Sequence, residues 1–392
     1  MGRSVVIGND SIARETPRSF ADIKIKDADI VLASLLFFDP AGGDGNTIYS
    51  MIRYCLIVYL CLKYLRCCKN IPIPSILLVL FSLLMMYSTW VNTHSLTWSF
   101  SGFMFGCGIL AVLLTFVDAS KRIPVNVILK RVLIVFAILL FFTDLAMLVL
   151  PYDNTNSNTV YLVGNKFIVS YAHCLLSGLM LVCFKDKVAL NRAVILIGAA
   201  AAYLAGSSTG ALMMAVMLAL TFLPVKTRPL ISNPLFLLIS IAALNVLIWG
   251  PINLFKMPEF QSFVVDVLHK SADMTGRERL YATTFDFVAM KPVFGWGYLT
   301  DIYRVTFGYG NAQNGLFHLI TQCGILGTAA YFSGLFSALI NRRSRGSEFF
   351  GIYAFLFAMV LGSSVEINLS FQFAFGIALL CGALRGNASI RR

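Results

Sequence analysis

The sequence has little charge. Only 13% of its 392 residues are charged, whereas 58% are hydrophobic and the mean hydropathy is +0.78. A soluble domain carries about 25% charged residues. Because the apolar runs are also long enough to cross a bilayer, we expect an all-α, polytopic integral membrane protein rather than a soluble helical protein with a large core.

Several catalytic and binding signatures are missing. The chain has no GxxxxGK[ST], HExxH or GxSxG motif and no DxD-type pair in an external loop. These absences argue against an ATPase, a zinc protease, a serine hydrolase and a metal-dependent nucleotide-sugar enzyme, so we expect no metal site and no cofactor. The nine cysteines lie in apolar segments or on the expected cytoplasmic side, which does not indicate a disulfide framework. The net charge of +12 lies in membrane connectors, so we expect no nucleic-acid partner.

About twelve apolar segments can be delimited. They cover 28–39, 47–61, 71–90, 96–117, 131–150, 166–183, 192–206, 209–223, 231–250, 314–340, 349–365 and 371–384. The uninterrupted part of the first is too short to span as a helix at ~1.5 Å per residue, so it is either a half-helix or an interfacial segment.

Lys and Arg concentrate in alternate connectors. Most of the 31 lie in 1–27, 62–70, 118–131, 184–192, 224–230, 341–348 and 385–392. The short connectors 40–46, 91–95, 151–165 and 366–370 contain none. The positive-inside rule therefore predicts that both termini are cytoplasmic. The chain divides into spans at 1–250, a large external loop at 251–313, and the last spans with the C-terminus at 314–392.

The large loop carries its own structural signals. Apolar residues spaced as on a helix predict an amphipathic helix over 260–268. Thr275 and Glu278 form a capping box, which predicts a second helix that ends near Met290 because Pro292 follows. We expect a turn at 295–298 and irregular chain over 303–309.

Arg277 and Arg279 fall in the first turn of the capped helix. A helix N-terminus favours anions, and arginine offers planar, paired donors to phosphate oxygens. The two residues are therefore a candidate pyrophosphate clamp. The alternative is that they form surface ion pairs with Asp273, Glu278 or Asp286.

A second polar group opens the 314–340 span. Gln313 and Asn314 stand at its start, and His318 lies about one turn inside, where an ionisable side chain is costly and suggests function. His318 is a candidate base, or a histidine bonded to a neighbouring helix. For His173 and Asp144, within other spans, we expect a structural contact between helices.

Arg53 and Lys166 mark the outer ends of two spans. Snorkelling toward the surface is the ordinary explanation, but the two are also placed to complete an anionic pocket. The tip at 207–209 carries Ser-Ser-Thr and no charge.

The stretch TGRERLYATTFDFVAMKPVFGWGY, followed by NAQNGLFHLITQCGILG, resembles the conserved region of the bacterial O-antigen ligase and O-antigen/exopolysaccharide polymerase family. The matching positions are Thr275, Gly276, Arg277, Tyr281, Pro292, Gly295, Gly297, Asn314, Gly324 and Gly327. Two positions depart from the family pattern. Gln313 stands where the family has histidine, and the 207–209 tip lacks the arginine that many members carry. Both departures favour a polymerase over a ligase.

This resemblance implies a metal-independent glycosyltransferase with a C-type membrane fold in the bacterial inner membrane. Its donor would be an undecaprenyl-pyrophosphate-linked oligosaccharide, transferred at the periplasmic face to a sugar hydroxyl of another repeat unit. Arg277 with Arg279 would hold the pyrophosphate.

The remaining candidate site residues follow from the same implied reaction. Catalytic roles fall to Gln313 and His318 beside Arg277, and substrate binding to Asn314, Trp296, Tyr298, Lys291, Arg53 and Lys166. Membrane lipids and a chain-length regulator protein are the expected partners.

Two other functions remain open. A ligase would pass the finished polymer to the lipid A core. A flippase for lipid-linked oligosaccharides would also have about twelve helices, but such carriers usually show internal repeats and charges at mid-membrane, which this chain largely lacks.

Overall fold

The computed structural model describes residues 28–40, 47–65, 71–92, 96–149, 159–249, 257–262, 265–266, 277–308, 310–340 and 347–389. Each of the predicted apolar segments coincides with a helix. These are α1 (Ala28–Leu35), α2 (Thr47–Tyr64), α3 (Ile73–Asn92), α4 (Leu96–Ala119), α5 (Val125–Val149), α6 (Lys166–Cys183), α7 (Val188–Leu204), α8 (Ser208–Thr221), α9 (Pro234–Trp249), α13 (Gly315–Ile340), α14 (Phe350–Gly362) and α15 (Phe371–Ser389).

The connectors contribute shorter elements. The large loop holds α10 (Pro258–Ser262), α11 (Arg277–Met290) and α12 (Ile302–Phe307). Two short 3₁₀ helices, η4 (Arg228–Leu230) and η8 (Ser347–Phe349), precede α9 and α14. Within the described residues, the only strands are β1 (Val160–Tyr161) and β2 (Gly164–Asn165), which pair antiparallel just before α6.

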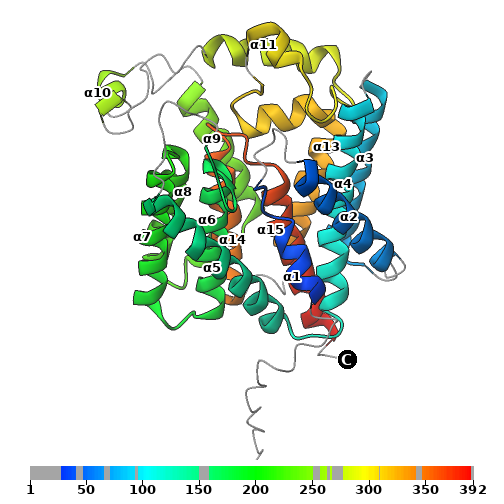
Figure 1. The fold of residues 1–392 in the computed structure, drawn as a ribbon. Helices are drawn as coiled ribbons and strands as arrows, with labels where there is room; N and C mark the ends of the chain where they lie inside the picture. Colours follow the sequence, from blue (N-terminus) through cyan, green and yellow to red (C-terminus); the bar gives the residue numbers. More distant parts are fainter. Residues whose placement is uncertain are drawn as a thin grey trace, which may run out of the picture.

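The helices form two groups (Figure 1). One group packs α2, α3, α4, α13 and α15, and the other packs α5 through α9 with α14. Helix α1 lies between α4 and α5, and α14 contacts α15, so the two groups are joined. Helix α11 lies across one end of the bundle, and α15 ends at the opposite end (Figure 1).

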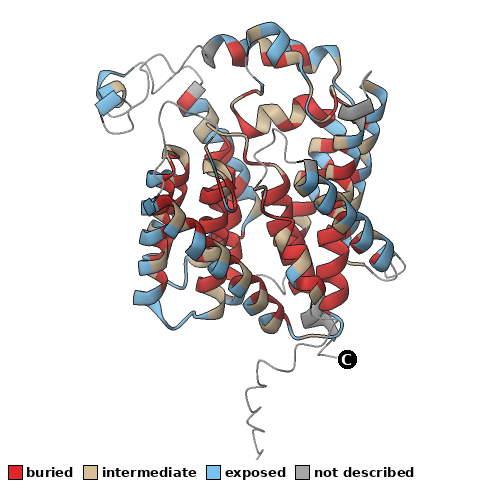
Figure 2. Cartoon of the chain, in the orientation of Figure 1, coloured by how far each residue is buried: buried red, intermediate tan, exposed pale blue. Residues whose placement is uncertain are grey.

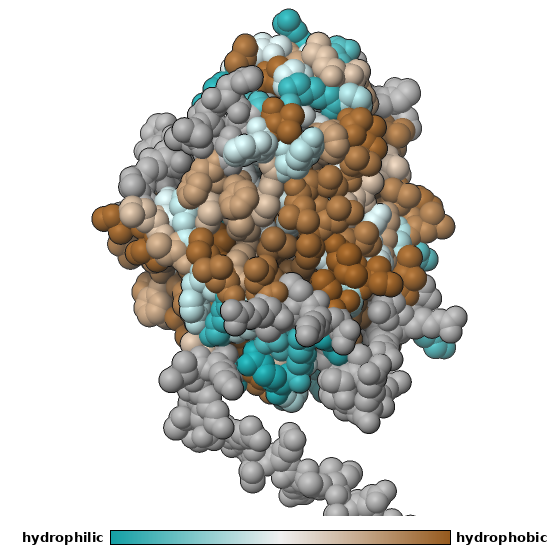
Figure 3. Space-filling view, turned by 90° about the vertical axis from the view of Figure 1, so that its right-hand side faces the viewer, coloured by the Kyte–Doolittle hydropathy of each residue, from teal (hydrophilic) through white to brown (hydrophobic). Residues whose placement is uncertain are grey.

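The outer surface is that of a membrane protein. In the described part of the chain, α3, α4 from Phe100, α5, α6 and α13 are long and apolar enough to cross a membrane, and α7, α8, α9, α14 and α15 are apolar but shorter. Buried residues fill the interior of both groups (Figure 2), and a hydrophobic belt lies between hydrophilic ends (Figure 3). Because such a belt suits hydrocarbon, the fold is all-α and polytopic, as predicted.

Polar caps set where two of the helices begin. The Asn165 side chain accepts hydrogen bonds from the first backbone N–H groups of α6, at 3.1 and 3.2 Å. The Ser207 hydroxyl accepts one from the Gly210 N–H at 3.1 Å, and Gly206 takes a φ of 74° in the turn before it. These contacts satisfy donors that a helix start leaves free. The chain therefore turns tightly between the end of α7 at Leu204 and the start of α8 at Ser208.

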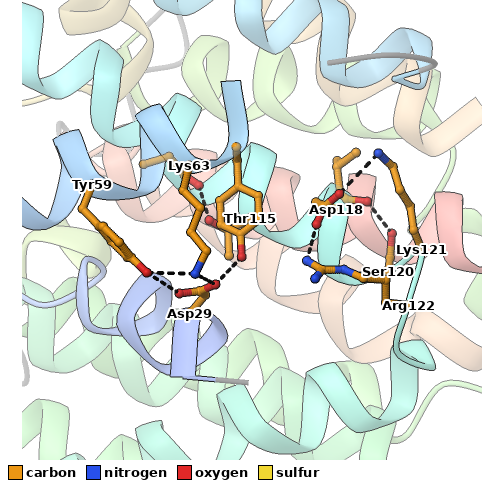
Figure 4. A network of polar contacts seen from close by, with 11 residues as sticks. Asp29, Tyr59, Lys63, Thr115, Asp118, Ser120, Lys121 and Arg122 are labelled. Carbon is orange, nitrogen blue, oxygen red and sulfur yellow. Dashed lines mark hydrogen bonds and ion pairs between the residues drawn. The ribbon is translucent and has the colours of Figure 1, made fainter. Parts of the chain in front are cut away.

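Helix α1 is short but held at both ends. The buried carboxylate of Asp29, in its first turn, accepts hydrogen bonds from Tyr59 and Tyr64 and pairs with Lys63 at 2.6 Å (Figure 4). The same figure shows Asp118, at the end of α4, between Lys121 and Arg122.

Side chains of α2 and α15 bind the other end of α1. The Tyr49 hydroxyl donates to the Phe38 carbonyl at 3.0 Å, and the Gln372 amide donates to the Phe37 carbonyl at 3.0 Å. The first apolar segment is therefore an eight-residue helix ended by a turn. Polar contacts at both ends hold this short helix against its neighbours.

The loop predictions have mixed outcomes. Helix α11 ends at Met290, as Pro292 predicts. Residues 303–309 were expected to be irregular, but α12 forms there because Ile302, Tyr303 and Phe307 pack into a small apolar core and Gly308 ends the helix with φ 75°. The capping residue Thr275 lies outside the described residues. Of the amphipathic helix expected over 260–268, α10 covers the beginning, and positions 263, 264, 267 and 268 lie outside the described residues.

Candidate functional site

Helices α11 and α12 form a cap that is packed onto the start of α13. Its small core is buried and apolar, and consists of Leu280, Tyr281, Phe287, Tyr303 and Ala312 with Phe317 packed against it. The Tyr281 hydroxyl donates to the Gln313 carbonyl at 3.0 Å. The Tyr303 hydroxyl lies 2.7 Å from the Thr321 hydroxyl and 3.3 Å from that of Thr284. The described part of the large loop is therefore a folded cap with a fixed attachment.

Arg277 is the first residue of α11. Helical spacing places positions 277, 281 and 284 on one face, and Tyr281 and Thr284 on that face are buried toward α13. Position 277 thus belongs to the face of α11 that looks to the start of α13. The free N–H groups of the first turn of α11 lie at the same end.

Arg279 is exposed and lies on another face. Its guanidinium carbon is 5.9 Å from the centre of the Phe307 ring. Asp286 is exposed two turns later, and within the described residues Arg279 forms no ion pair with it. Of the alternative ion pairs, the one between Arg279 and Asp286 is therefore not formed. The acidic side chains of Asp273 and Glu278 lie outside the described part.

Helix α13 is broken at Gly324, where φ is 65° and ψ is −171°. The turn after Pro292 forms main-chain hydrogen bonds with residues of α13 on both sides of the break. The bonds run from Trp296 N–H to Thr321 C=O at 2.8 Å, Gly297 N–H to Gln322 C=O at 2.8 Å, Ile325 N–H to Pro292 C=O at 2.8 Å and Leu326 N–H to Val293 C=O at 3.2 Å. These bonds satisfy backbone groups that a broken helix would otherwise leave unpaired in an apolar setting.

The close approach explains both glycines at the break. A Cβ at Gly295 would lie 2.5 Å from the Gly324 nitrogen, and a Cβ at Gly324 would lie 2.3 Å from the Val293 carbonyl oxygen. Both residues also have positive φ, which side chains disfavour. The Pro-x-x-Gly-x-Gly part of the sequence motif thus builds the joint between the cap and the broken helix.

Helix α3 braces the joint from the other side. The Asn92 amide donates to the Gly295 carbonyl at 2.9 Å, and the Ser88 hydroxyl donates to the Gln322 carbonyl at 2.9 Å. Lys291 donates to the Asn92 side-chain oxygen at 2.5 Å and lies 4.2 Å from the centre of the Trp296 ring. Lys291 and Trp296, predicted to bind substrate, therefore both contact other parts of the joint.

The side chains of Trp296 and Tyr298, on either side of Gly297, also contact other elements. The Trp296 indole N–H donates to the Phe287 carbonyl at 2.8 Å, and the Tyr298 ring stacks on Phe105 with ring centres 4.4 Å apart. Burial raises the pKa of Tyr298 to about 12, an effect that the nearby Arg53 opposes. Tyr298 is thus a neutral phenol packed against α4.

Asn314 is a buried structural connector. Its amide donates to the Asn245 side chain at 3.0 Å and to the Ser364 carbonyl at 3.1 Å, and its oxygen accepts from the Phe317 N–H at 3.1 Å. Asn314 has no exposed surface. It therefore caps α13 and joins that helix to α9 and to the turn after α14.

Gln313 precedes it with an unusual backbone. Its φ is 50°, and its N–H donates to the Asn311 side chain at 2.9 Å. The left-handed conformation of a residue without a glycine's freedom marks a constrained position. The constraint fixes the direction in which the chain enters α13.

His318 lies one turn inside α13. Its Nε2 is 3.0 Å from the Gln322 side-chain nitrogen, and its Nδ1 is buried and has no hydrogen-bond partner among the described residues. With the Gln322 amide N–H facing the ring, Nε2 accepts and a neutral ring carries its proton on Nδ1. The ring centre lies 6.2 Å from that of Tyr303, so His318 borders the core of the cap.

Arg53 and Lys166 lie on neighbouring segments. Arg53 pairs with Asp39 at 3.4 Å and lies 5.7 Å from the centre of the Phe371 ring. The Asp39 N–H donates to the Val163 carbonyl at 3.0 Å, in the hairpin that leads directly to Lys166. A charge pair, rather than snorkelling alone, positions Arg53.

The structural contacts between helices expected for His173 and for Asp144 are confirmed, and the two residues contact each other. The His173 Nε2 lies 3.0 Å from an Asp144 carboxylate oxygen and joins α6 to α5. In the described residues, no group of three or more His, Cys, Asp or Glu side chains has the arrangement of a metal site.

Several residues that shape the site were not predicted. Asn92 and Asn245 each carry an amide near the end of an apolar span and bond to a distant element, and the Gln322 amide bonds to His318 within its own helix. An amide within an apolar run was the available signal, because such a group must find a partner when it is buried.

The comparisons with known proteins agree with this architecture. A family model described as O-Antigen ligase matches residues 193–332, which extend from α7 through the cap and past the break in α13. No curated protein and no solved structure matches the chain. Residues 193–332 are therefore an O-antigen ligase family domain, and the resemblance seen in the sequence is confirmed.

Proposed function

We propose that the protein is a glycosyltransferase that polymerises lipid-linked oligosaccharide repeat units, of an O-antigen or an exopolysaccharide. The family is one of glycosyltransferase-like enzymes of the O-antigen ligase and polymerase type. The observation that carries the proposal is the position of Arg277, at the N-terminus of α11 and on the helix face directed toward the start of α13.

The proposed donor is a glycan on undecaprenyl pyrophosphate. Arg277, with Arg279 and the free N–H groups of α11, binds the pyrophosphate and stabilises the charge that it gains on leaving. A cap at the end of an apolar bundle suits a donor whose lipid tail stays in the membrane and whose headgroup stays in water. Membrane lipids surround the site, and a chain-length regulator protein remains a predicted partner.

In the proposed reaction, a sugar hydroxyl of another repeat unit attacks the anomeric carbon of the donor. The new bond joins that oxygen to the anomeric carbon, and the bond from the same carbon to the pyrophosphate oxygen breaks. The leaving group keeps the electron pair, so its negative charge grows next to Arg277. The hydroxyl proton passes to water, or to the Nε2 of His318 if the acceptor hydroxyl takes the place of the Gln322 amide at that nitrogen.

The residues at the start of α13 orient the acceptor in this proposal. Gln313 and His318 lie on either side of the capped turn, and Asn314 fixes that turn from its buried position. The joint with α13 holds the cap in place over the start of that helix. Its contacts include those of Lys291, Trp296 and Tyr298. Arg53 and Lys166 remain predicted anion contacts.

The topology of the proposal follows from charge placement. Short connectors at the α11 end contain no Lys or Arg, whereas the opposite end carries many. We place the α11 end in the periplasm of a bacterial inner membrane and both termini in the cytoplasm. No metal is required, because Arg277 and a helix N-terminus supply the positive charge.

A ligase is the second candidate, because the matching family model is described as O-Antigen ligase. The glycan ladder of a deletion strain distinguishes the two. We expect single-repeat glycans on the cell surface, which identify a polymerase. Full-length polymer that stays on the lipid carrier would instead identify a ligase.

A further inference from the structure

The end of the bundle opposite α11 carries a group of basic side chains. They lie in the connectors between α6 and α7 and between α8 and α9, and on the first turn of α7. We call them the basic rim: Lys185, Lys187, Arg192, Lys226 and Arg228. Within the described residues none of these five forms an ion pair with a carboxylate. The five therefore leave a net positive charge, although the carboxylate of Asp186 lies between Lys185 and Lys187 in the sequence.

The two arginines of the basic rim are already oriented. The guanidinium carbon of Arg192 lies 3.9 Å from the centre of the Phe222 ring, and its Nε donates to the Thr221 hydroxyl at 3.2 Å. Stacking fixes the plane of the guanidinium and leaves its two terminal nitrogens free for a planar, paired contact. Less side-chain freedom is then lost when an anion binds.

Arg228 is held in a similar way. Its guanidinium carbon lies 4.6 Å from the centre of the Phe350 ring, at the start of α14. Its Nε is buried and has no hydrogen-bond partner among the described residues. A buried donor without an acceptor is costly. Nε itself is covered by the protein, so an anionic oxygen from outside would meet the terminal nitrogens of this half-buried side chain, which form no hydrogen bond with the described residues.

Apolar side chains lie exposed between the basic ones. They are Phe184, Val188, Leu190, Phe222, Val225 and Leu230, whose exposed fractions range from 39% to 63%. A surface that alternates exposed apolar groups with unpaired basic groups matches the boundary between acyl chains and headgroups. An acidic soluble protein would match the charge but not the apolar groups.

We propose that the basic rim binds the phosphates of anionic phospholipids, with Arg192 and Arg228 as two separate phosphate-binding positions. Phosphatidylglycerol and cardiolipin present this chemistry, whereas phosphatidylcholine carries a compensating cation. The exposed lysines add a general attraction for the negative leaflet. The stacked arginines add selectivity, because their geometry is set before the lipid arrives.

The test uses the full-length protein in detergent, with its melting temperature measured against added phosphatidylglycerol, phosphatidylcholine or inorganic phosphate. We expect only phosphatidylglycerol to raise the melting temperature. The double variant Arg192→Gln/Arg228→Gln should need about tenfold more phosphatidylglycerol for the same rise. The matched double variant Lys185→Gln/Lys187→Gln loses the same charge and should respond almost as the wild type does.

Three results would overturn the proposal. If both double variants needed equally more phosphatidylglycerol for the same rise in melting temperature, the effect would be diffuse charge attraction and not binding at the two arginines. An equal response to phosphatidylcholine would remove the headgroup selectivity, and an equal response to inorganic phosphate would indicate a free-anion site. If the arginine variant does not fold, the proposal is tested by native mass spectrometry of the wild type in an equal mixture of phosphatidylglycerol and phosphatidylcholine. Preferential retention of phosphatidylglycerol supports the proposal, and equal retention refutes it.

Discussion

Gly324→Ala is the substitution that tests the joint between the cap and α13 most severely. The new Cβ would lie 2.3 Å from the Val293 oxygen and 2.6 Å from the Gly295 nitrogen. The backbone at Gly324 also occupies a region that is nearly restricted to glycine, which costs about 1–3 kcal/mol for any other residue.

The overlap cannot be relieved without moving the turn. If one or two of the four main-chain bonds between the turn and α13 are lost, each contributes a further ~0.5–1.5 kcal/mol. The sum is a destabilisation of about 3 kcal/mol. Because the same turn positions α11, we also expect a large loss of polymer formation.

The assay pairs thermal unfolding in detergent with the glycan ladder of a complemented deletion strain. Gly310→Ala is the matched control in the same loop. Among the described residues, a Cβ there would meet only the Arg304 Nη2, at 3.8 Å, and Gly310 is not among the described glycines with a positive φ. We expect this control to change stability by less than about 0.5 kcal/mol. A Gly324→Ala protein with wild-type melting temperature and normal polymer would refute the account of the joint.

Three further substitutions probe the site. Asn92→Leu removes the brace between α3 and the turn, and we expect a stability loss of about 1–3 kcal/mol in thermal unfolding together with shortened glycan ladders. Asn314→Leu leaves the Asn245 side-chain oxygen without its donor and removes the cap of α13, so we expect a similar loss in the free energy of unfolding and a lower melting temperature. An unchanged melting temperature would contradict the structural role of Asn314. His318→Ala should insert normally and abolish polymer if His318 takes the acceptor proton; retained polymer would assign that role elsewhere, for example to Asp286 or to water.

Hydropathy was sufficient to predict the spans, because, apart from the large loop at 251–313, each apolar segment is longer than the connector that follows it and charge marks the ends. Pro292 likewise predicted the end of α11, since the ring excludes helical geometry at the residue before it. These features depend on local sequence alone.

The break in α13 was not predictable in the same way. The run from Gly315 to Ile340 has no charged residue and no proline, and Gly324 within it has no local signal that separates a break from a packing position. The partner of the break is a turn about thirty residues earlier, brought there by α11. Only the tertiary arrangement shows that Gly295 and Gly324 face each other.

Candidate substrate contacts were the least predictable part of the site. Trp296 and Asn314 have the side chains expected of sugar-binding residues, yet their polar atoms bond to Phe287 and Asn245. A sequence pattern does not reveal whether an aromatic or amide group faces a ligand or another helix. The outer residue Asn92, which carried no motif, braces the cap.

The central claim is that Arg277, at the start of α11, holds the pyrophosphate of the donor. The most direct measurement is polymer formation by Arg277→Ala, with the amount of membrane-inserted protein measured in parallel. Arg304→Ala is the control, because Arg304 is an exposed arginine of the same cap, 4.0 Å from Asp301. We predict normal insertion of both proteins, no polymer from Arg277→Ala and wild-type polymer from Arg304→Ala. Polymer of normal length from Arg277→Ala would contradict the account.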